Sequence, residues 1–354
     1  MKKLSILLAS VLTVTTLLVG CGSKEASTNT KEEPKTLTIS TWGFNEDLLK
    51  KNVYEPFEKK YNVKIVLEKG NNGERLTKLK QKKEGIDLIY LADLYSMQGI
   101  KQGLFEKINT ENIPNLNNVY DLAKAPQGEG YGPAYTINSL GIVYDPEVIK
   151  TPITSWADLW KPELKGKIAI PDITVTAGPL MMMVAGDQAG VDIKGNEAKA
   201  FDKMKQLAPS VVKYYGKSSE LANMFNQGEI AVAVIQDFAY GNILKACPQA
   251  KFVTPAEGSY VGLNTINVVK GSKNKELAEK FIDFALSEEV QTATGKAKVE
   301  APANKNVKLT EEEAKGQTYG EEMIKKLKSV NWEYVNEVNK QWIDTWNKEI
   351  SSGK

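Results

Sequence analysis

The residue types best suited to hold a small molecule stand at the ends of short apolar runs. Trp42 and Phe44 lie at the end of TLTISTWGF, Asp172 follows KIAIP, and Gln236 with Asp237 follows IAVAVI. An aromatic ring stacks on an apolar or cationic group, and a carboxylate pairs with an amine. These positions therefore predict contacts with a small solute. For Asp237 a second explanation stays open, because an acid after an apolar strand also serves as a helix cap.

Other polar residues occupy similar positions. Asp93 and Tyr95 fall in the predicted loop Ala92–Tyr95, and Asn264 lies in the strand-like run YVGLNTINVV. Thr174 and Thr176 precede a predicted helix, whose first N–H groups could hold a carboxylate or phosphonate as readily as Asp172 could hold an amine. Thr176 is also a helix-cap candidate. We expect all of these residues near one site.

The composition excludes several kinds of chemistry. The 354 residues contain no histidine and, among 46 basic residues, one arginine, Arg75. A Ser-His-Asp or Cys-His nucleophile and an imidazole metal ligand are therefore absent from the sequence, and an arginine-rich nucleic-acid surface is not expected. The 44 acidic residues form no recognisable catalytic pair. We predict no enzyme, no metal, no cofactor and no nucleic-acid partner. An exported hydrolase with two carboxylates about 5–10 Å apart, and a surface adhesin, remain alternatives.

The first residues look like an export signal. Two lysines precede an apolar run of about 16 residues, which is short for a membrane span, and Gly20-Cys21 follows. Leu18–Cys21 resembles the bacterial lipobox, which implies cleavage before Cys21 and lipidation of its thiol; a plain signal peptide is the alternative. Loss of residues 1–20 removes Lys2 and Lys3 and brings the net charge from +2 to zero. Residues 21–35 then form a polar tether. Because the thiol of Cys21 would carry lipid, the other cysteine, Cys247, has no partner for a disulfide.

Strand-like and helix-like runs alternate along the rest of the chain, which predicts open sheets covered by helices. The first set comprises strands 36–42, 63–67 and 87–91 with helices 45–61, 75–82 and 96–103. After Pro133 come strands 134–138, 140–144, 167–171, 211–215, 230–235 and 260–269, with helices 156–160, 177–189, 197–207, 218–227, 238–246 and 274–286. The tail from Thr310 is expected to be helical. In such sheets ligands bind beyond the carboxyl ends of the strands.

The segment TSWADLWKPELKGKIAIP (154–171) resembles the spermidine/putrescine-binding group of bacterial ABC-transporter solute-binding proteins. Supporting stretches include GPAYTINSLGIV (132–143) and FNQGEIAVAVI (225–235). The resemblance implies an α/β, two-lobed type II periplasmic-binding fold, each lobe a mixed sheet flanked by helices, with a hinge near Tyr135 and Tyr260. The expected organisation is a signal at 1–20, a tether at 21–35, lobe 1 at 36–134 plus 261–303, and lobe 2 at 135–260 plus 304–350.

The resemblance also implies a role. A lipid-anchored monomer on the extracytoplasmic face of the cell membrane would capture a small polar solute, a polyamine or related amine, and deliver it to an ABC permease. Relatives have pocket side chains that align with Trp42 and Asp172. They have tryptophans where Gln236 and Gly262 stand, and an aspartate at Asn264. The pocket is therefore expected to be roomier and less selective for cations, and an anionic or zwitterionic solute such as an aminophosphonate, amino acid or vitamin precursor is the alternative.

Overall fold

The computed structural model describes residues 34–81 and 85–352, which belong to one compact unit, Pro34–Lys354. The expected signal sequence and Cys21 lie outside the described residues. Ten strands form the sheet: β1 (Lys35–Thr41), β2 (Val63–Lys69), β3 (Leu88–Ala92), β4 (Ala134–Tyr144), β5 (Ile168–Pro171), β6 (Val211–Tyr215), β7 (Val232–Gln236), β8 (Lys251–Val253), β9 (Ser259–Val268) and β10 (Leu327–Lys328).

The strands run in the spatial order β2-β1-β3-β9-β4-β7-β5-β6, with β10 beside β9 and β8 beside β4. Strands β2, β1 and β3 are parallel to one another, and so are β7, β5 and β6. Strand β9 is antiparallel to β3 and β4, and β4 is antiparallel to β7 and β8, whereas the short β10 pairs with β9 in parallel. We call β1–β3 with their helices the first half, β5–β7 with theirs the second half, and β4 and β9 the central strands.

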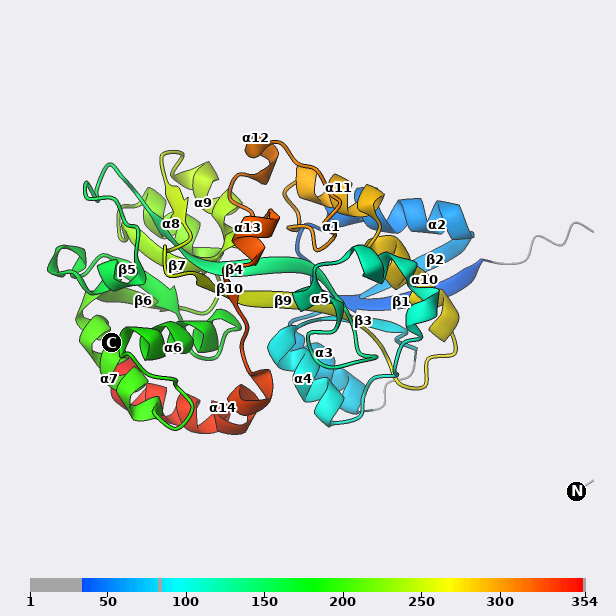
Figure 1. The fold of residues 1–354 in the computed structure, drawn as a ribbon, viewed down its shortest axis with the longest axis horizontal. Coiled ribbons are helices and arrows are strands. Elements are labelled where there is room, and N and C mark those ends of the chain that lie inside the picture. Colours follow the sequence, from blue (N-terminus) through cyan, green and yellow to red (C-terminus); the bar gives the residue numbers. More distant parts are fainter. Residues whose placement is uncertain (1–33, 82–84, 353–354) are drawn as a thin grey trace, which may run out of the picture. The chain divides into compact units, whose positions relative to one another are not determined.

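The central strands join the two halves (Figure 1). Residues Ala134–Ser139 of β4 pair with β9, whereas Leu140–Tyr144 pair with β7. Every residue of β4 is buried. The sequence analysis predicted two separate strands here, 134–138 and 140–144. That division is wrong, since the strand exchanges pairing partners between Ser139 and Leu140 without ending.

Helices cover both faces of the sheet (Figure 1). The α-helices are α1 (Glu46–Leu49), α2 (Glu55–Tyr61), α3 (Asn72–Lys80), α4 (Asp93–Lys101), α5 (Asp121–Lys124), α6 (Ala177–Gln188), α7 (Glu197–Leu207), α8 (Glu220–Asn226), α9 (Tyr240–Ala246), α10 (Lys275–Ala285), α11 (Glu288–Lys296), α12 (Glu311–Ala314), α13 (Glu321–Ile324) and α14 (Trp332–Trp346). Short 3₁₀ or π turns are η1 (Lys50–Tyr54), η2 (Thr110–Asn112), η3 (Pro114–Asn118), η4 (Trp156–Trp160), η5 (Pro162–Leu164), η6 (Ala208–Ser210), η7 (Asp237–Ala239) and η8 (Asn347–Ser351).

Two large hydrophobic clusters fix the halves. The cluster of the first half includes Leu37, Phe57 and Phe281, and that of the second half includes Met181 and Trp342. In α10, residues 278, 281, 282 and 285 share one face at helical spacing and are buried, which is why this segment is a helix. The Phe57 and Phe281 ring centroids are 5.0 Å apart. An aromatic pair of this kind stabilises the fold by about 0.5–1.5 kcal/mol beyond its buried area.

Three further expectations are corrected by the structure. The predicted helix 45–61 contains the π turn η1 just before Pro56, because proline cannot donate to the preceding turn and its ring crowds the carbonyl four residues earlier. The predicted loop Ala92–Tyr95 is absent, since α4 begins at Asp93 directly after β3. The tail from Thr310 is only partly helical, and Gly316 and Gly320 interrupt it with φ of +78° and +91°.

Candidate ligand-binding site

A cavity of about 260 Å³ lies where strands of both halves end and the central strands pass. Strands β1, β3 and β7 end at Thr41, Ala92 and Gln236, and each of these three residues reaches the cavity. This is the edge at which open α/β sheets bind ligands. Its lining is drawn from both halves and both central strands: Thr41, Trp42, Phe44, Leu49, Asn72, Ala92, Tyr135, Thr136, Asn138, Thr176, Gln236, Phe238, Asn264, Val299 and Glu300.

Aromatic rings form part of the wall. Phe44 follows β1 and Phe238 follows β7, so they come from opposite halves, yet their ring centroids are 6.2 Å apart with planes at 72°. Their side chains are also exposed, at 45% and 43%. This edge-to-face contact bridges the two halves at the cavity. Trp42, which is half-buried, adds a third ring and meets the buried Tyr90 edge-on at 6.4 Å.

The chain's single arginine holds the Trp42 side of the cavity in place. The Arg75 guanidinium lies 4.8 Å from the centre of the Trp42 ring and is completely buried. It donates hydrogen bonds to the carbonyls of Gly70, Ser40 and Tyr90, two of which are on β1 and β3. Burial lowers the pKa of Arg75 to about 10, which still leaves it charged at neutral pH.

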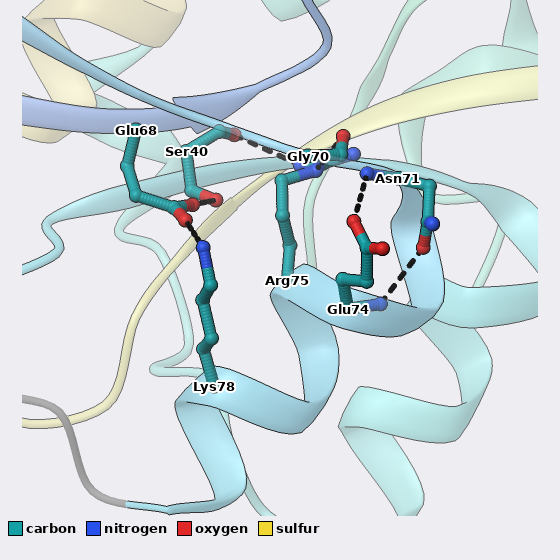
Figure 2. A network of polar contacts seen from close by, with 7 residues as sticks. All are labelled: Ser40, Glu68, Gly70, Asn71, Glu74, Arg75 and Lys78. Atoms are coloured by element: carbon teal, nitrogen blue, oxygen red, sulfur yellow. Dashed lines mark hydrogen bonds and ion pairs between the residues drawn. The ribbon is translucent and has the colours of Figure 1, made fainter.

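A second set of contacts fixes the start of α3 (Figure 2). The first residue of this helix, Asn72, lines the cavity. The Asn71 side chain accepts from the Glu74 N–H at 2.9 Å, and the Glu74 carboxylate accepts from the Asn71 N–H, so the two form a capping box. The carboxylate of Glu68 joins Ser40 of β1 to Lys78 of α3. Burial raises the pKa of Glu68, but the hydrogen bonds from Lys78 and Ser40, together with the positive charges of Lys78 and Arg75, lower it overall.

The cavity contains a carboxyl group that the sequence analysis missed. Glu300 lines it, and the hydroxyl of the buried Tyr135, on β4, donates to the Glu300 carboxylate. Burial raises the pKa of Glu300 to about 8 against the opposing effect of this hydrogen bond. Glu300 follows α11 in the segment KVEAPAN, which gives no helical or strand period. The one feature of the sequence that could have identified Glu300 as a site residue was a single acid inside the apolar stretch Val299–Pro302.

The remaining polar groups of the lining are neutral. Asn138, Gln236 and Asn264 present side-chain amides, and within the described residues no protein group hydrogen-bonds to them. The hydroxyl of Thr136, a residue 1% exposed, also has no partner within that part of the chain. Gly262 on β9 gives the Gln236 amide its room, since a Cβ there would lie 2.1 Å from Nε2. These groups are available to a ligand.

Half of the residues predicted for the site meet at this cavity. Trp42, Phe44, Thr176, Gln236 and Asn264 line it. The predicted residues that do not line it are Asp93, Tyr95, Asp172, Thr174 and Asp237.

The carboxylates among them are engaged by other protein groups. Asp172 accepts from the N–H and hydroxyl of Thr174 at 3.0 and 2.5 Å. Asp93 accepts from the N–H of Leu263 at 3.1 Å, and Asp237 from the N–H of Thr318 at 2.6 Å. Asp237 borders a hollow of about 70 Å³ next to the cavity, and Tyr95 packs against the hydrophobic clusters.

A second hollow of about 320 Å³ adjoins the cavity and shares Phe44, Thr176, Gln236 and Phe238 with it. Lys217, Ser218 and Ser219 line this hollow, together with the first residue of α6. Its lining therefore offers a cation and hydroxyl groups, in contrast to that of the main cavity.

Cys247 follows α9 and is buried, with its sulfur 3.6 Å from a carboxylate oxygen of Asp145. Burial raises the pKa of its thiol to about 11, so it is a poor nucleophile. Across residues 34–81 and 85–352 there is no group of three His, Cys, Asp or Glu side chains that could bind a metal ion. A search of the same residues finds no helix with the length and apolar character of a membrane span.

Comparisons with known proteins agree with this architecture. The family of bacterial extracellular solute-binding proteins matches residues 52–320. The spermidine/putrescine-binding periplasmic protein of Escherichia coli is 27% identical over 266 residues, covering 73% of this chain and 75% of that protein. The crystal structure of an ABC transporter protein from Clostridium perfringens is 52% identical, with a TM-score of 0.81 over 89% of this chain and 99% of that one.

A further structure shares the fold. The spermidine/putrescine ABC transporter substrate-binding protein of Streptococcus pneumoniae superposes with a TM-score of 0.74 at 20% identity, covering 88% of this chain and 99% of that one. The mixed sheet flanked by helices is the two-lobed type II periplasmic-binding fold that the family resemblance implied. The chain is therefore a member of the bacterial extracellular solute-binding protein family, the solute-capturing components of ABC transporters.

Proposed function

We propose that this chain captures an amine-bearing solute, a polyamine or a related compound, in the cavity lined by Trp42 and Glu300, and passes it unchanged to an ABC permease. One observation carries the proposal: a carboxyl group, Glu300, shares a cavity with four aromatic rings, those of Trp42, Phe44, Tyr135 and Phe238. A carboxylate and ring faces are the groups that bind an ammonium ion. The names of the curated relatives, which include spermidine and putrescine binders, support the same class of ligand.

The mechanism we infer is closure of two lobes over the solute. Lobe 1 comprises residues 36–134 and 261–303, and lobe 2 comprises 135–260 and 304–350, with β4 and β9 as the hinge. The contact between Phe44 and Phe238 supports this, because it joins the segments that follow β1 and β7, one from each half, at the cavity. The protein acts as a monomer without enzymatic activity, tethered to the outer face of the cell membrane through lipid on Cys21.

The test is calorimetric titration with polyamines, other amines, amino acids, aminophosphonates and vitamin precursors, followed by mass analysis of the recovered ligand. We expect one amine to bind with 1:1 stoichiometry and to be recovered intact, and Glu300→Gln to weaken its binding about tenfold or more. Glu229→Gln, which removes an exposed acid outside the cavity, is the control. Unchanged affinity in Glu300→Gln, or chemical conversion of the ligand, would contradict the proposal.

A second candidate ligand is an anionic or zwitterionic solute. The adjoining hollow favours it, because Lys217, Ser218 and the start of α6 lie beside the main cavity. Tight binding of an aminophosphonate or amino acid, lost in Lys217→Met and retained in Glu300→Gln, would select this candidate instead.

A further inference from the structure

The number of carboxylates in a cavity that can contact a ligand limits the number of positive charges that the ligand can carry. Among the described residues, Glu300 is the one acidic side chain in the lining of the main cavity, and no lysine or arginine lines it. An ammonium group buried without a countercharge costs several kcal/mol, more than the roughly 0.5–2 kcal/mol that contact with a ring face returns, so each one needs its own carboxylate. The cavity therefore supplies the countercharge for one ammonium group.

The nearest other candidate for a second countercharge is Asp237, which borders the small adjoining hollow. Its carboxylate already accepts four hydrogen bonds: from the Thr318 N–H and hydroxyl at 2.6 and 2.5 Å, from the Phe238 N–H at 3.0 Å, and from the Ser139 N–H at 3.4 Å. A carboxylate has about four acceptor positions, so Asp237 has none left for a ligand. Asp93 lies outside the lining and accepts from the N–H groups of Leu94 and Leu263.

The neutral groups of the lining specify the rest of the ligand. Each of the amides of Asn138, Gln236 and Asn264 carries two N–H donors, and none of these donors has an acceptor among the described protein groups. A fully protonated linear polyamine contains donors only, and would leave the amide donors unpaired. An unpaired buried donor is costly, so the ligand should carry acceptor atoms such as hydroxyl, carbonyl or ring-nitrogen groups.

We propose that the ligand of this cavity carries one positive charge together with uncharged hydrogen-bond acceptors, and that linear di- and triamines are not preferred. This inference rests on the proposed function, because it assumes that the cavity is the capture site. The raised pKa of Glu300 is consistent with it, since the empty cavity is then largely uncharged and acquires its single negative charge when a cation enters.

The test uses four-carbon ligands that differ at one end: 4-amino-1-butanol, 1,4-diaminobutane, 1-aminobutane and 4-aminobutanoate, with spermidine as a trication. Affinities are measured by calorimetry at pH 7.5. We expect 4-amino-1-butanol to bind about tenfold more tightly than each of the others. A higher affinity for 1,4-diaminobutane, spermidine or 4-aminobutanoate overturns the inference while leaving capture at this cavity intact.

A charge-adding variant makes the test independent of absolute affinity. Gln236→Glu places a second carboxylate in the cavity. The ratio of the affinity for 1,4-diaminobutane to that for 4-amino-1-butanol should therefore rise at least tenfold. Gln102→Glu adds the same charge at an exposed position outside the lining and should leave the preference unchanged. No shift in Gln236→Glu, with circular dichroism and thermal unfolding like those of the wild type, overturns the inference. If none of the ligands binds any of the three proteins at 10 mM, the inference and the proposed function fail together.

Discussion

Asp93 and Asp237 make the same pair of hydrogen bonds at the ends of two different strands. Each follows its strand directly, β3 or β7, and accepts from the N–H of the next residue, at 2.9 and 3.0 Å. Each also accepts from an N–H of a central strand, Leu263 of β9 at 3.1 Å and Ser139 of β4 at 3.4 Å. The two acids therefore attach both halves to the central strands, which explains why they are buried although no basic side chain in the described part of the chain pairs with them.

These buried acids make the stability of the fold depend on pH. Burial raises the pKa of Asp93 to about 7 and that of Asp237 to about 6. A carboxyl group with a raised folded-state pKa contributes stability that is complete below about pH 4 and is lost as the pH rises through the folded-state pKa. In urea unfolding, the free energy of unfolding of Asp93→Asn should be lower than that of the wild type at pH 5, and this difference should shrink as the pH rises to 8. A difference in unfolding free energy that stays constant or grows with pH would contradict this. Asp344→Asn, at an exposed position, is the control and should show no such change with pH.

Ligand binding should release a proton from Glu300. Because its pKa is raised to about 8, this carboxyl is mostly protonated at pH 7 until a cation lowers its pKa. Titrations at pH 7 in two buffers of different ionisation enthalpy should report release of close to one proton for each cation bound, and none in Glu300→Gln. Equal heats in both buffers for the wild type would show that the cation does not pair with Glu300.

The contact between Phe44 and Phe238 should slow the escape of the ligand. Their rings meet at 6.2 Å, and an aromatic contact of this type is worth about 0.5–1.5 kcal/mol, or about 2–10-fold in a rate. Phe238→Ala should therefore raise the dissociation rate constant by about that factor, as measured by stopped-flow fluorescence. Val148→Ala, at another exposed apolar position, should not. An unchanged dissociation rate in Phe238→Ala would exclude a gating role.

The buried guanidinium should be hard to replace. Arg75 donates to three carbonyls at 3.0, 3.1 and 2.5 Å, an arrangement that a lysine ammonium cannot reproduce. We expect Arg75→Lys to lose about 2–3 kcal/mol of unfolding free energy, because a buried carbonyl left without its donor costs about 1–3 kcal/mol. Lys78→Met breaks the partly exposed ion pair with Glu68 and should cost about 1 kcal/mol or less. Similar losses in the two variants, measured by urea unfolding, would contradict this reading of the network.

Local sequence signals gave much of the fold. Strand β6 and helix α7 have the predicted bounds, because the Pro209 turn and the Gly195-Asn196 turn delimit them. Trp42 and Phe44 follow β1 and Gln236 ends β7, and all three reach the cavity because the ends of these strands were recognisable from the sequence. The continuity of β4 was not predictable in this way, since it depends on pairing with β9 and β7, which are far away in the sequence.

The polar partners of the acids were beyond local reasoning. Asp93 and Asp237 look like ligand-binding acids in the sequence, but their hydrogen bonds come from Leu263 and Thr318, which are 170 and 81 residues away. Glu300 lies in a segment without a period and reaches the cavity only because the chain after α11 passes Tyr135. Contacts of this kind depend on the tertiary fold, so the composition of a local segment does not reveal them.

The burial of Arg75 has a practical consequence. The sequence contains no other arginine, so a dicarbonyl reagent such as phenylglyoxal has one guanidinium to modify, and in the folded chain that group is completely shielded from solvent. The rate of this modification therefore measures how often the structure opens transiently between α3 and the adjoining strand ends. Mass spectrometry can follow it without any engineered label.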